Sequence, residues 1–262
     1  MKKISVCGKG GSGKSAITTL LANAIRERGY KVLVIDSDES NPGLYRMLGF
    51  DRPPIPLIEL LGGKMRVEEK LAAAVRAGKS ELEAALMPEE PISIIEIPAQ
   101  YLLESDGLRL AMVGKIHSSR EGCACPMGAV TREFLRKLRL QDNEVAIVDM
   151  EAGVEHFGRG VGMGLDSVLV VVDPSFESLI IAERVKKLSA EMEIGDVWAI
   201  LNKVTSEKLR SKLTKELEKR DIAVIGTVHY DPEIFEADLE GLPVFGLRAA
   251  ADLPKILNSL LL

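Results

Sequence analysis

One segment near the N-terminus, residues 8–15, limits what this chain can fold into more than any other part of the sequence. It is Gly-Lys-Gly-Gly-Ser-Gly-Lys-Ser and fits the pattern G-x-x-x-x-G-K-[ST] in full. The apolar run 4–7 precedes it, and residues 16–25 follow it with the apolar spacing of a helix. A strand, a glycine-rich turn and a helix start are the context of a P-loop. The segment therefore predicts an α/β nucleotide-binding fold.

Each residue type in this segment suits the binding of a nucleotide. Backbone N–H groups of a glycine-rich turn can wrap a phosphate, and the helix N-terminus adds partial positive charge. We expect Lys14 to reach the β- and γ-phosphates and the Ser15 hydroxyl to ligate Mg²⁺. The alternative is a glycine-rich turn without a ligand, which the complete motif disfavours. The residues expected around the phosphates are Gly8, Lys9, Gly10, Gly11, Ser12, Gly13, Lys14 and Ser15.

The composition fits one soluble globular domain that spans residues 1–262. The chain is 46% hydrophobic and 28% charged, and its length suffices for a single large core. The net charge of −5 argues against an obligatory nucleic-acid partner, because phosphate binding needs a basic face. No apolar run approaches the ~20 residues of a transmembrane helix, and the first strand begins at once. We therefore expect a cytoplasmic protein without a signal peptide or membrane partner.

Acidic residues follow the second predicted strand, residues 31–35. Asp36 and Asp38 would lie at the carboxyl end of a parallel strand, where α/β sheets place their ligands. Beside a Mg²⁺-phosphate site, such carboxylates ligate the metal through water or position the attacking water. The alternative is a capping turn before a helix, which Asn41-Pro42-Gly43 would suit. Both interpretations are compatible with the sequence.

A second acidic strand end has the form of a Walker B element. The predicted strand 144–149 ends in Asp149, whose carboxylate would support Mg²⁺ through water. Gly153 follows in the pattern D-x-x-A-G, and a glycine there lets the backbone approach a γ-phosphate and move when that phosphate leaves. A strand-end Asp that caps a turn is the alternative, and the upstream P-loop makes it less plausible.

Strands and helices alternate along most of the remaining chain. We predict a P-loop NTPase with a mostly parallel sheet of about seven or eight strands and helices on both faces. Residues 51–91 interrupt the alternation as an excursion from the core, with surface helices expected at 66–76 and 80–87. The apolar segment 253–262 is expected to pack in the core rather than anchor a membrane. Further strands are expected at 109–113, 167–172, 197–201 and 222–226, and further helices at 127–140, 175–190, 205–219 and 231–239.

The strand 197–201 ends in Asn202 and Lys203. An amide at the end of a strand beside a nucleotide site can hydrogen-bond the edge of an adenine. The alternative for Asn202 is a turn residue, for which asparagine is well suited.

Two of the three cysteines, Cys123 and Cys125, stand one residue apart in the polar loop 114–126. Two thiolates can bind one soft metal ion, but they are half of a tetrahedral set. A twofold dimer axis through this loop would supply four sulfurs. The spacing alone leaves open two unrelated small residues or an adventitious redox pair. His117 is either a further ligand or a surface histidine. Cys7, within the first strand, is expected to be a packing residue.

Lys9 makes this P-loop unusual, because it adds a second lysine directly after the first glycine. The form K-G-G-x-G-K-[ST] resembles the deviant Walker A signature of the family that contains ParA, MinD and the nitrogenase iron protein. In that family the first lysine crosses a dimer interface, so the resemblance implies an ATP-dependent homodimer. A solvated surface charge is the alternative for Lys9.

Within that family the chain resembles the CooC-type nickel-insertion ATPases of carbon monoxide dehydrogenase maturation. The resemblance spans nearly the whole chain and includes Cys-Ala-Cys-Pro at 123–126, Val-Asp-Met-Glu-Ala-Gly-Val-Glu-His at 148–156, and Asn202-Lys203. It implies a Mg²⁺-dependent ATPase that holds nickel, or zinc in its place, between Cys123 and Cys125 of two subunits. The client implied is carbon monoxide dehydrogenase or acetyl-CoA synthase. Ser15 stands where many relatives carry threonine, and it keeps the hydroxyl.

The same resemblance implies roles for individual residues. Asp38 matches the switch residue that orients or activates water, which makes Lys9, Lys14 and Asp38 the candidate catalytic residues. Asp36 is the weaker acidic candidate, either structural or linked to Mg²⁺. Asn202, with Lys203 beside it, matches the position of a base contact.

Two other functions remain open at this point. The first is a ParA- or MinD-like partitioning or positioning switch that binds DNA or a membrane, which the acidic net charge disfavours. The second is a redox ATPase that resembles the nitrogenase iron protein and holds an iron–sulfur cluster across the dimer. The cysteines of that protein lie far apart in sequence, unlike the C-x-C pair here.

Overall fold

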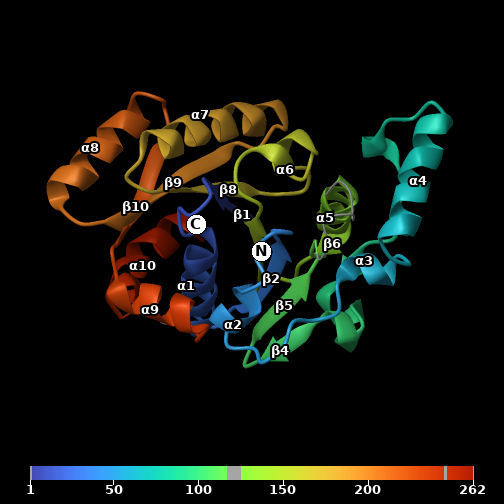
Figure 1. The fold of residues 1–262 in the computed structure, drawn as a ribbon, viewed down its shortest axis with the longest axis horizontal. Helices are drawn as coiled ribbons and strands as arrows, with labels where there is room; N and C mark the ends of the chain where they lie inside the picture. Colours follow the sequence, from blue (N-terminus) through green and yellow to red (C-terminus); the bar gives the residue numbers. More distant parts are fainter. Residues whose placement is uncertain (1, 117–124, 245–246, 262) are drawn as a thin grey trace.

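A twisted, mostly parallel β-sheet runs through the computed structural model of the protein, which describes residues 2–116, 125–244 and 247–261 (Figure 1). Within these residues the sheet has eight strands in the order β10-β9-β8-β1-β7-β2-β5-β4. This arrangement confirms the predicted fold class. The strands are β1 (Lys2–Gly8), β2 (Lys31–Ser37), β4 (Leu103–Ser105), β5 (Leu108–Met112), β7 (Glu144–Met150), β8 (Ser167–Val172), β9 (Asp196–Val204) and β10 (Ala223–His229).

The register of the central strands brings the predicted acidic residues together. Strand β1 pairs in parallel with β7 and β8, and Val6 is in register with Asp149. Strand β2 pairs with β7 so that Asp36 is in register with Asp149. Continuous apolar runs, as in the wholly buried β8, suit strands that are covered on both faces. The carboxyl ends of β1, β2 and β7 therefore meet at one edge of the sheet.

Helices cover both faces of the sheet (Figure 1). One apolar core contains side chains of α4, α5, α7 and α8, and a second, on the opposite face, contains side chains of α1, α2 and α10. Because apolar residues alternate along the strands, the sheet contributes to both cores. The helices are α1 (Lys14–Glu27), α2 (Leu44–Met47), α3 (Leu57–Leu60), α4 (Lys64–Arg76), α5 (Cys125–Lys137), α6 (Glu155–Gly158), α7 (Phe176–Glu191), α8 (Glu207–Glu218), α9 (Pro232–Glu240) and α10 (Leu247–Leu260).

The segment 51–91 contains α3 and α4, which lie at one end of the molecule in Figure 1. Helix α4 matches the helix expected at 66–76, but the helix expected at 80–87 is wrong. A single 3-10 turn, Glu81–Glu83, forms there, and Ser80 caps it. Leu86 and Met87 are adjacent and both buried, an arrangement that the single apolar stripe of a surface helix does not provide. Packing therefore overrides local helix propensity.

Two short strands were not anticipated from the sequence. Strands β3 (Ile92–Ser93) and β6 (Leu138–Arg139) pair in a separate two-stranded sheet. The formation of β6 ends helix α5 at Lys137, three residues before the end predicted at 140. Strand β4 adds an antiparallel edge beside β5.

The C-terminal helix α10 packs in the core, as expected. Its apolar residues Leu253, Ile256, Leu257 and Leu260 are buried in the core that α1 also lines. Cys7 is likewise fully buried, and burial raises the pKa of its thiol to about 12. Among the described helices, none has the length and apolar character to span a bilayer.

Candidate nucleotide-binding site

The P-loop connects the end of β1 to the start of α1, and its glycines adopt conformations that other residues rarely do. Gly8 has φ of 144°, and a Cβ there would lie 2.5 Å from the carbonyl oxygen of Val171. Gly13 has φ of 94° and directly precedes α1, with the side-chain amide of Asn202 against its α-carbon. Only glycine fits such close contacts with positive φ. A side chain at Gly8 or Gly13 would therefore strain the backbone and collide with a neighbouring residue.

Two hydroxyl groups in the first turns of α1, those of Ser15 and Thr18, contact Asp149 near the end of β7. The hydroxyl of Ser15 donates a 2.6 Å hydrogen bond to Oδ2 of Asp149, and the Thr18 hydroxyl donates a 3.3 Å bond to Oδ1. The side-chain amide of Asn41 donates to the Ser15 oxygen at 2.7 Å. A hydroxyl and a carboxylate are oxygen donors of the kind that Mg²⁺ prefers. The residues present therefore fit a Mg²⁺-nucleotide at this position.

Asp149 is fully buried at the base of this site. Burial raises the pKa of its carboxyl group to about 6, and the hydrogen bond from Ser15 and the charge of Lys14 oppose that rise. A buried carboxylate is costly without a compensating cation. A divalent cation at the Ser15 hydroxyl would favour the ionised form.

Asp36, the other acidic residue in this register, forms an ion pair rather than facing the P-loop. Its Oδ2 lies 2.7 Å from Nζ of Lys115, and both side chains are almost completely buried. Burial raises the pKa of Asp36 to about 7, although Lys115 lowers it. Lys115 also donates to the backbone carbonyls of Asp38 and Asn41, both at 2.5 Å. Asp36 therefore helps Lys115 to hold the loop after β2, which fits the structural alternative.

Asp38 lines the nucleotide-sized cavity and also closes a turn. Its Oδ1 accepts hydrogen bonds from the backbone N–H of Ser40 at 2.9 Å, from the Ser40 hydroxyl at 2.6 Å and from the N–H of Asn41 at 3.2 Å. Oδ2 takes part in none of these three bonds. The capping turn therefore uses Oδ1 alone, and the same residue lines the cavity.

Lys9 does not point into its own cavity. Its Nζ lies 3.3 Å from Asp173 and 3.9 Å from Glu177, at the end of β8 and the start of α7. Partial burial disfavours the ionised Asp173, but bonds from Ser178, Ser175 and Lys9 together lower its pKa. These two carboxylates hold the Lys9 side chain away from the cavity of its own chain.

Asn202 and Lys203 contact the P-loop itself. The Asn202 amide donates to the carbonyl of Ser12 at 2.8 Å, and Nζ of Lys203 donates to the carbonyl of Gly11 at 2.7 Å. Both residues line the cavity beside the loop. The end of β9 therefore supports the back of the phosphate cradle.

A cavity of about 660 Å³ opens over the P-loop. This volume falls in the usual range for a small-molecule site. The P-loop and α1 form its floor, the loop after β2 and the end of β9 form two sides, and α9 with the end of β10 forms the rest. The residues of that last wall are His229, Tyr230, Asp231, Ile234, Phe235 and Asp238. Phosphate donors at one end and apolar side chains at the other suit a nucleotide.

The backbone connects this cavity to the loop after β7. The N–H of Gly153 donates a 3.0 Å hydrogen bond to the carbonyl of Gly8, and Gly153 has φ of 90°. The loop that follows Asp149 is thereby anchored on the first residue of the P-loop. The approach of Gly153 to a γ-phosphate stays a prediction.

Comparison with known proteins agrees with this geometry. The profile of the CobQ/CobB/MinD/ParA nucleotide binding domain matches residues 4–244. The chain belongs to this nucleotide-binding family. Its P-loop, its acidic strand ends and its cavity are thus those of an ATP-binding P-loop family of the MinD and ParA type.

Several relatives match along most of their length. An uncharacterized ATP-binding protein of Methanocaldococcus jannaschii is 44% identical over 91% of this chain and 92% of its own. The carbon monoxide dehydrogenase accessory protein CooC of Rhodospirillum rubrum is 31% identical over 95% of this chain and 91% of its own. The structure of MinD with Mg-ADP from Pyrococcus horikoshii has a TM-score of 0.68 at 19% identity and covers 99% and 95% of the two chains. This last likeness establishes the fold alone.

Only part of the predicted C-x-C site falls within the described residues of this family member. Cys125 is partly buried and begins α5, whereas Cys123 and His117 lie outside the described ranges. The preceding residues, Lys115 and Ile116, are tied to the loop after β2, since the N–H of Ile116 donates to the carbonyl of Glu39 at 3.3 Å. The last described residue before the cysteines, Ile116, therefore lies beside the loop after β2.

Sequence reasoning missed several residues of this site. Lys115 follows the end of β5, and a lysine after a strand gives no signal of a buried ion pair until the neighbouring strand is known. Thr18 lies one turn into α1, where its hydroxyl looks like an ordinary helix residue. The sequence also did not predict that α9 lines the cavity, because this helix carries no recognisable motif.

Proposed function

We propose that this protein is a Mg²⁺-dependent ATPase that works as a metallochaperone, a nucleotide-gated homodimer that inserts nickel into a carbon monoxide dehydrogenase or acetyl-CoA synthase-type metallocluster. The contact of Ser15 with Asp149 beneath a complete P-loop carries the ATPase part of the proposal. The similarity to the CooC accessory protein over 95% of the chain, together with the C-x-C pair, supports the metal-insertion part.

Within the ATPase site each residue has one task. The P-loop amides and Lys14 hold the phosphates and neutralise their charge. Ser15 provides a hydroxyl ligand for Mg²⁺, which neutralises charge that develops on the phosphates, and Asp149 supports it from behind. Oδ2 of Asp38 orients the attacking water while Oδ1 keeps its loop in place. Asn202 moves from the carbonyl of Ser12 to contact the adenine.

Lys9 is assigned to the dimer interface. Its ion pair with Asp173 is a resting contact that Lys9 exchanges for the phosphates of the partner's nucleotide. An exposed or partly exposed pair of this kind contributes at most about 1 kcal/mol, so it is readily exchanged. Lys9→Ala should bind ATP but fail to dimerise with it, whereas a normally dimerising Lys9→Ala protein would exclude this role.

The metal is held by Cys123 and Cys125 of both subunits, which together provide four thiolates. Nucleotide-dependent movement of the loops after β2 and β7 would change the geometry of the segment that carries these cysteines. We assign the reaction to the cytoplasm and the client to a nickel-dependent metalloenzyme.

The test measures metal content and native mass of the purified protein with and without Mg·ATP. The parent is compared with the Cys123→Ala/Cys125→Ala variant. We expect one nickel or zinc ion per dimer that depends on the cysteines, and a dimer that ATP favours. Dimerisation with ATP but without any cysteine-dependent metal would overturn the metallochaperone proposal and leave the ATPase proposal intact.

A partitioning or positioning switch is the second candidate, because MinD and ParA structures share the fold. The C-terminal helix weighs against a membrane-binding version, since Leu253, Ile256 and Leu257 are buried and not available to lipid. Salt-sensitive binding to DNA, or sedimentation with liposomes in the presence of ATP, would favour this candidate.

A further inference from the structure

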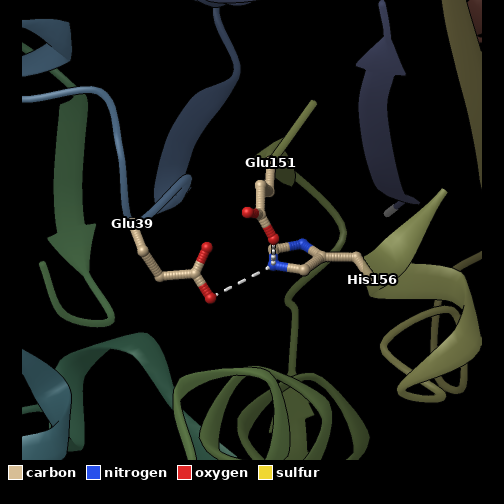
Figure 2. Close-up of side chains that lie close together, drawn as sticks. All are labelled: Glu39, Glu151 and His156. Atoms are coloured by element: carbon tan, nitrogen blue, oxygen red, sulfur yellow. Dashed lines mark hydrogen bonds and ion pairs between the residues drawn. The ribbon is translucent and has the colours of Figure 1, made fainter. Parts of the chain in front are cut away.

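A second group of polar side chains, two of them buried and one partly exposed, lies beside the nucleotide site and has no part in it. Glu39 follows Asp38 in the loop after β2, Glu151 lies in the loop after β7, and His156 lies in α6. Figure 2 shows that the carboxylate groups of both glutamates approach the same edge of the His156 ring. The side chains of Glu39 and His156 are each 2% exposed. Three loops or helices thus converge on one buried point.

The distances within this group match the spacing of donor atoms around a metal ion and are long for hydrogen bonds. Nε2 of His156 lies 3.4 Å from Oε1 of Glu39 and 3.6 Å from Oε2 of Glu151. All three atoms lie within 4.8 Å of one another. Donor atoms around a tetrahedral ion with bonds of about 2.1 Å lie about 3.4 Å apart. Good N–H···O hydrogen bonds are shorter, at about 2.9 Å.

The same chain provides an internal standard for a histidine–carboxylate hydrogen bond. Nδ1 of His229 lies 2.8 Å from Oδ2 of Asp252. At His156, by contrast, a single ring nitrogen faces two carboxylates, and one N–H can point at only one of them. A cation between the three atoms would satisfy all of them at once.

The electrostatics of the group also favour an added cation. The carboxylates of Glu39 and Glu151 both face Nε2 of His156, which places two acidic groups side by side. Within the described residues, Oε2 of Glu39 is buried and has no hydrogen-bond partner. Unpaired buried polar atoms are uncommon and call for a specific explanation.

Arg159 is the one positive charge recorded next to these carboxylates in the described part of the chain. Its Nη1 lies 3.1 Å from Oε2 of Glu151 and 3.6 Å from Oε1 of Glu39. One guanidinium group balances the charge of only one of the two carboxylates. Its side chain is 24% exposed, so it can turn toward solvent when another cation enters. Arg159 is therefore a competitor for the position of a metal ion, and it keeps the carboxylates together without one.

We infer that Glu39, Glu151 and His156 form a binding site for a divalent first-row transition-metal ion, separate from the C-x-C pair. One imidazole nitrogen and two carboxylate oxygens suit Zn²⁺, Ni²⁺ or Co²⁺, and the imidazole makes the set less suitable for Mg²⁺. The site needs neither cysteine, so it stands whether or not the chain is a nickel chaperone.

The test uses Co²⁺ as an optical probe on the full-length, nucleotide-free Cys123→Ser/Cys125→Ser protein. We expect one Co²⁺ per chain, with a visible d–d spectrum and no sulfur-to-cobalt charge-transfer band. His156→Gln or Glu151→Gln should each lower the affinity by at least about 10-fold, since even outer-shell substitutions cost about that much. His229→Gln is the matched control and should leave the affinity unchanged.

Arg159→Gln separates the metal site from an ordinary ion-pair cluster. If Arg159 competes with the metal, this substitution raises the Co²⁺ affinity several-fold. Glu151 is partly exposed, so Glu151→Gln should fold even if His156→Gln does not, and thermal unfolding checks both. Absence of Co²⁺ binding in the cysteine-free protein, or equal binding after His156→Gln and Glu151→Gln, would overturn the inference. Neither result depends on the fate of the cysteine-bound metal.

Discussion

The nucleotide cradle and the Glu39–Glu151–His156 group lie at the same edge of the sheet, but they differ in how completely their polar atoms are hydrogen-bonded. In the cradle, Ser15 bonds to Asp149 at 2.6 Å and Asn202 bonds to a P-loop carbonyl at 2.8 Å. In the other group the contacts are 3.4 Å and 3.6 Å, and one buried carboxylate oxygen has no hydrogen-bond partner in the part of the chain that the structure describes.

This difference distinguishes two ways to prepare a binding site. The cradle is preorganised by hydrogen bonds within the chain, so a ligand exchanges existing bonds for new ones and the loop keeps its shape. The second group holds like charges close together, so a ligand removes an unfavourable interaction. Substitutions in the cradle should therefore change nucleotide binding and hydrolysis. Substitutions of the buried charges outside the cradle should instead change the stability of the loops after β2 and β7.

The largest effect is expected from Lys14→Ala. We expect its ammonium group to contact the transferred phosphate, and loss of one such stabilising group should lower turnover by about 1000-fold. Steady-state release of phosphate measures the effect. Lys203→Ala is the control, because Lys203 bonds only to the carbonyl of Gly11 in this structure and should change turnover a few-fold at most. Equal losses in the two variants would show that cradle shape, and not the charge of Lys14, limits hydrolysis.

Lys115→Met should produce the next largest effect, on stability. It leaves Asp36 buried without its cation, and breaking a buried pair costs about 3 kcal/mol of unfolding free energy. Without Lys115 the pKa of Asp36 rises above its value of about 7, because Lys115 lowers it. Ionisation of Asp36 then costs the folded state more, so the loss of stability should grow as pH rises above about 7.

Denaturant unfolding at two pH values measures this loss. Lys208→Met, on the exposed face of α8, is the matched control and should stay within about 0.5 kcal/mol of the parent. A loss no larger than that of the control would mean that the loop after β2 does not depend on the Lys115 contacts.

The pH dependence of Mg·ADP binding comes third. Asp149 has a pKa of about 6 without ligand, and Mg²⁺ favours its ionised form. Binding should therefore release a proton, and affinity should fall by up to about tenfold per pH unit below about pH 6. Calorimetry in buffers with different ionisation enthalpies counts the proton. The dependence should disappear in Asp149→Asn, and its persistence there would assign the proton to another group.

The smallest effect is expected from Asn202→Ala. Loss of one hydrogen bond to the base costs about 1 kcal/mol, or about fivefold in ATP affinity. Inorganic tripolyphosphate, which has no base, should bind the variant and the parent alike. An equal loss for both ligands would mean that Asn202 supports the P-loop carbonyl and not the adenine.

The parts of this molecule that the sequence predicts are those encoded by adjacent residues. The P-loop, the strand ending in Asp149 and the turn at Asp38 each occupy a few consecutive positions, so spacing alone locates them. The alternation of apolar runs predicted the sheet and its helices, because strand and helix periods differ.

The remainder depends on which strands become neighbours. Lys115 meets Asp36 only because β5 lies beside β2, and His156 meets Glu39 across 117 positions of sequence. The segment 80–87 has a helical pattern but forms only one 3-10 turn followed by irregular chain, and Leu86 and Met87 are both buried in the core. No local pattern carries that information.

The two glutamates of the proposed metal site have a consequence for how the protein would respond to its ligands. Glu39 directly follows Asp38, and Glu151 lies two residues after Asp149, so the same two loops serve both sites. If nucleotide occupancy changes metal affinity by some factor, thermodynamic linkage requires the metal to change nucleotide affinity by that same factor. A cell's supply of metal would then set how tightly the protein retains ATP, and the proposed ATPase would respond to metal as well as to nucleotide.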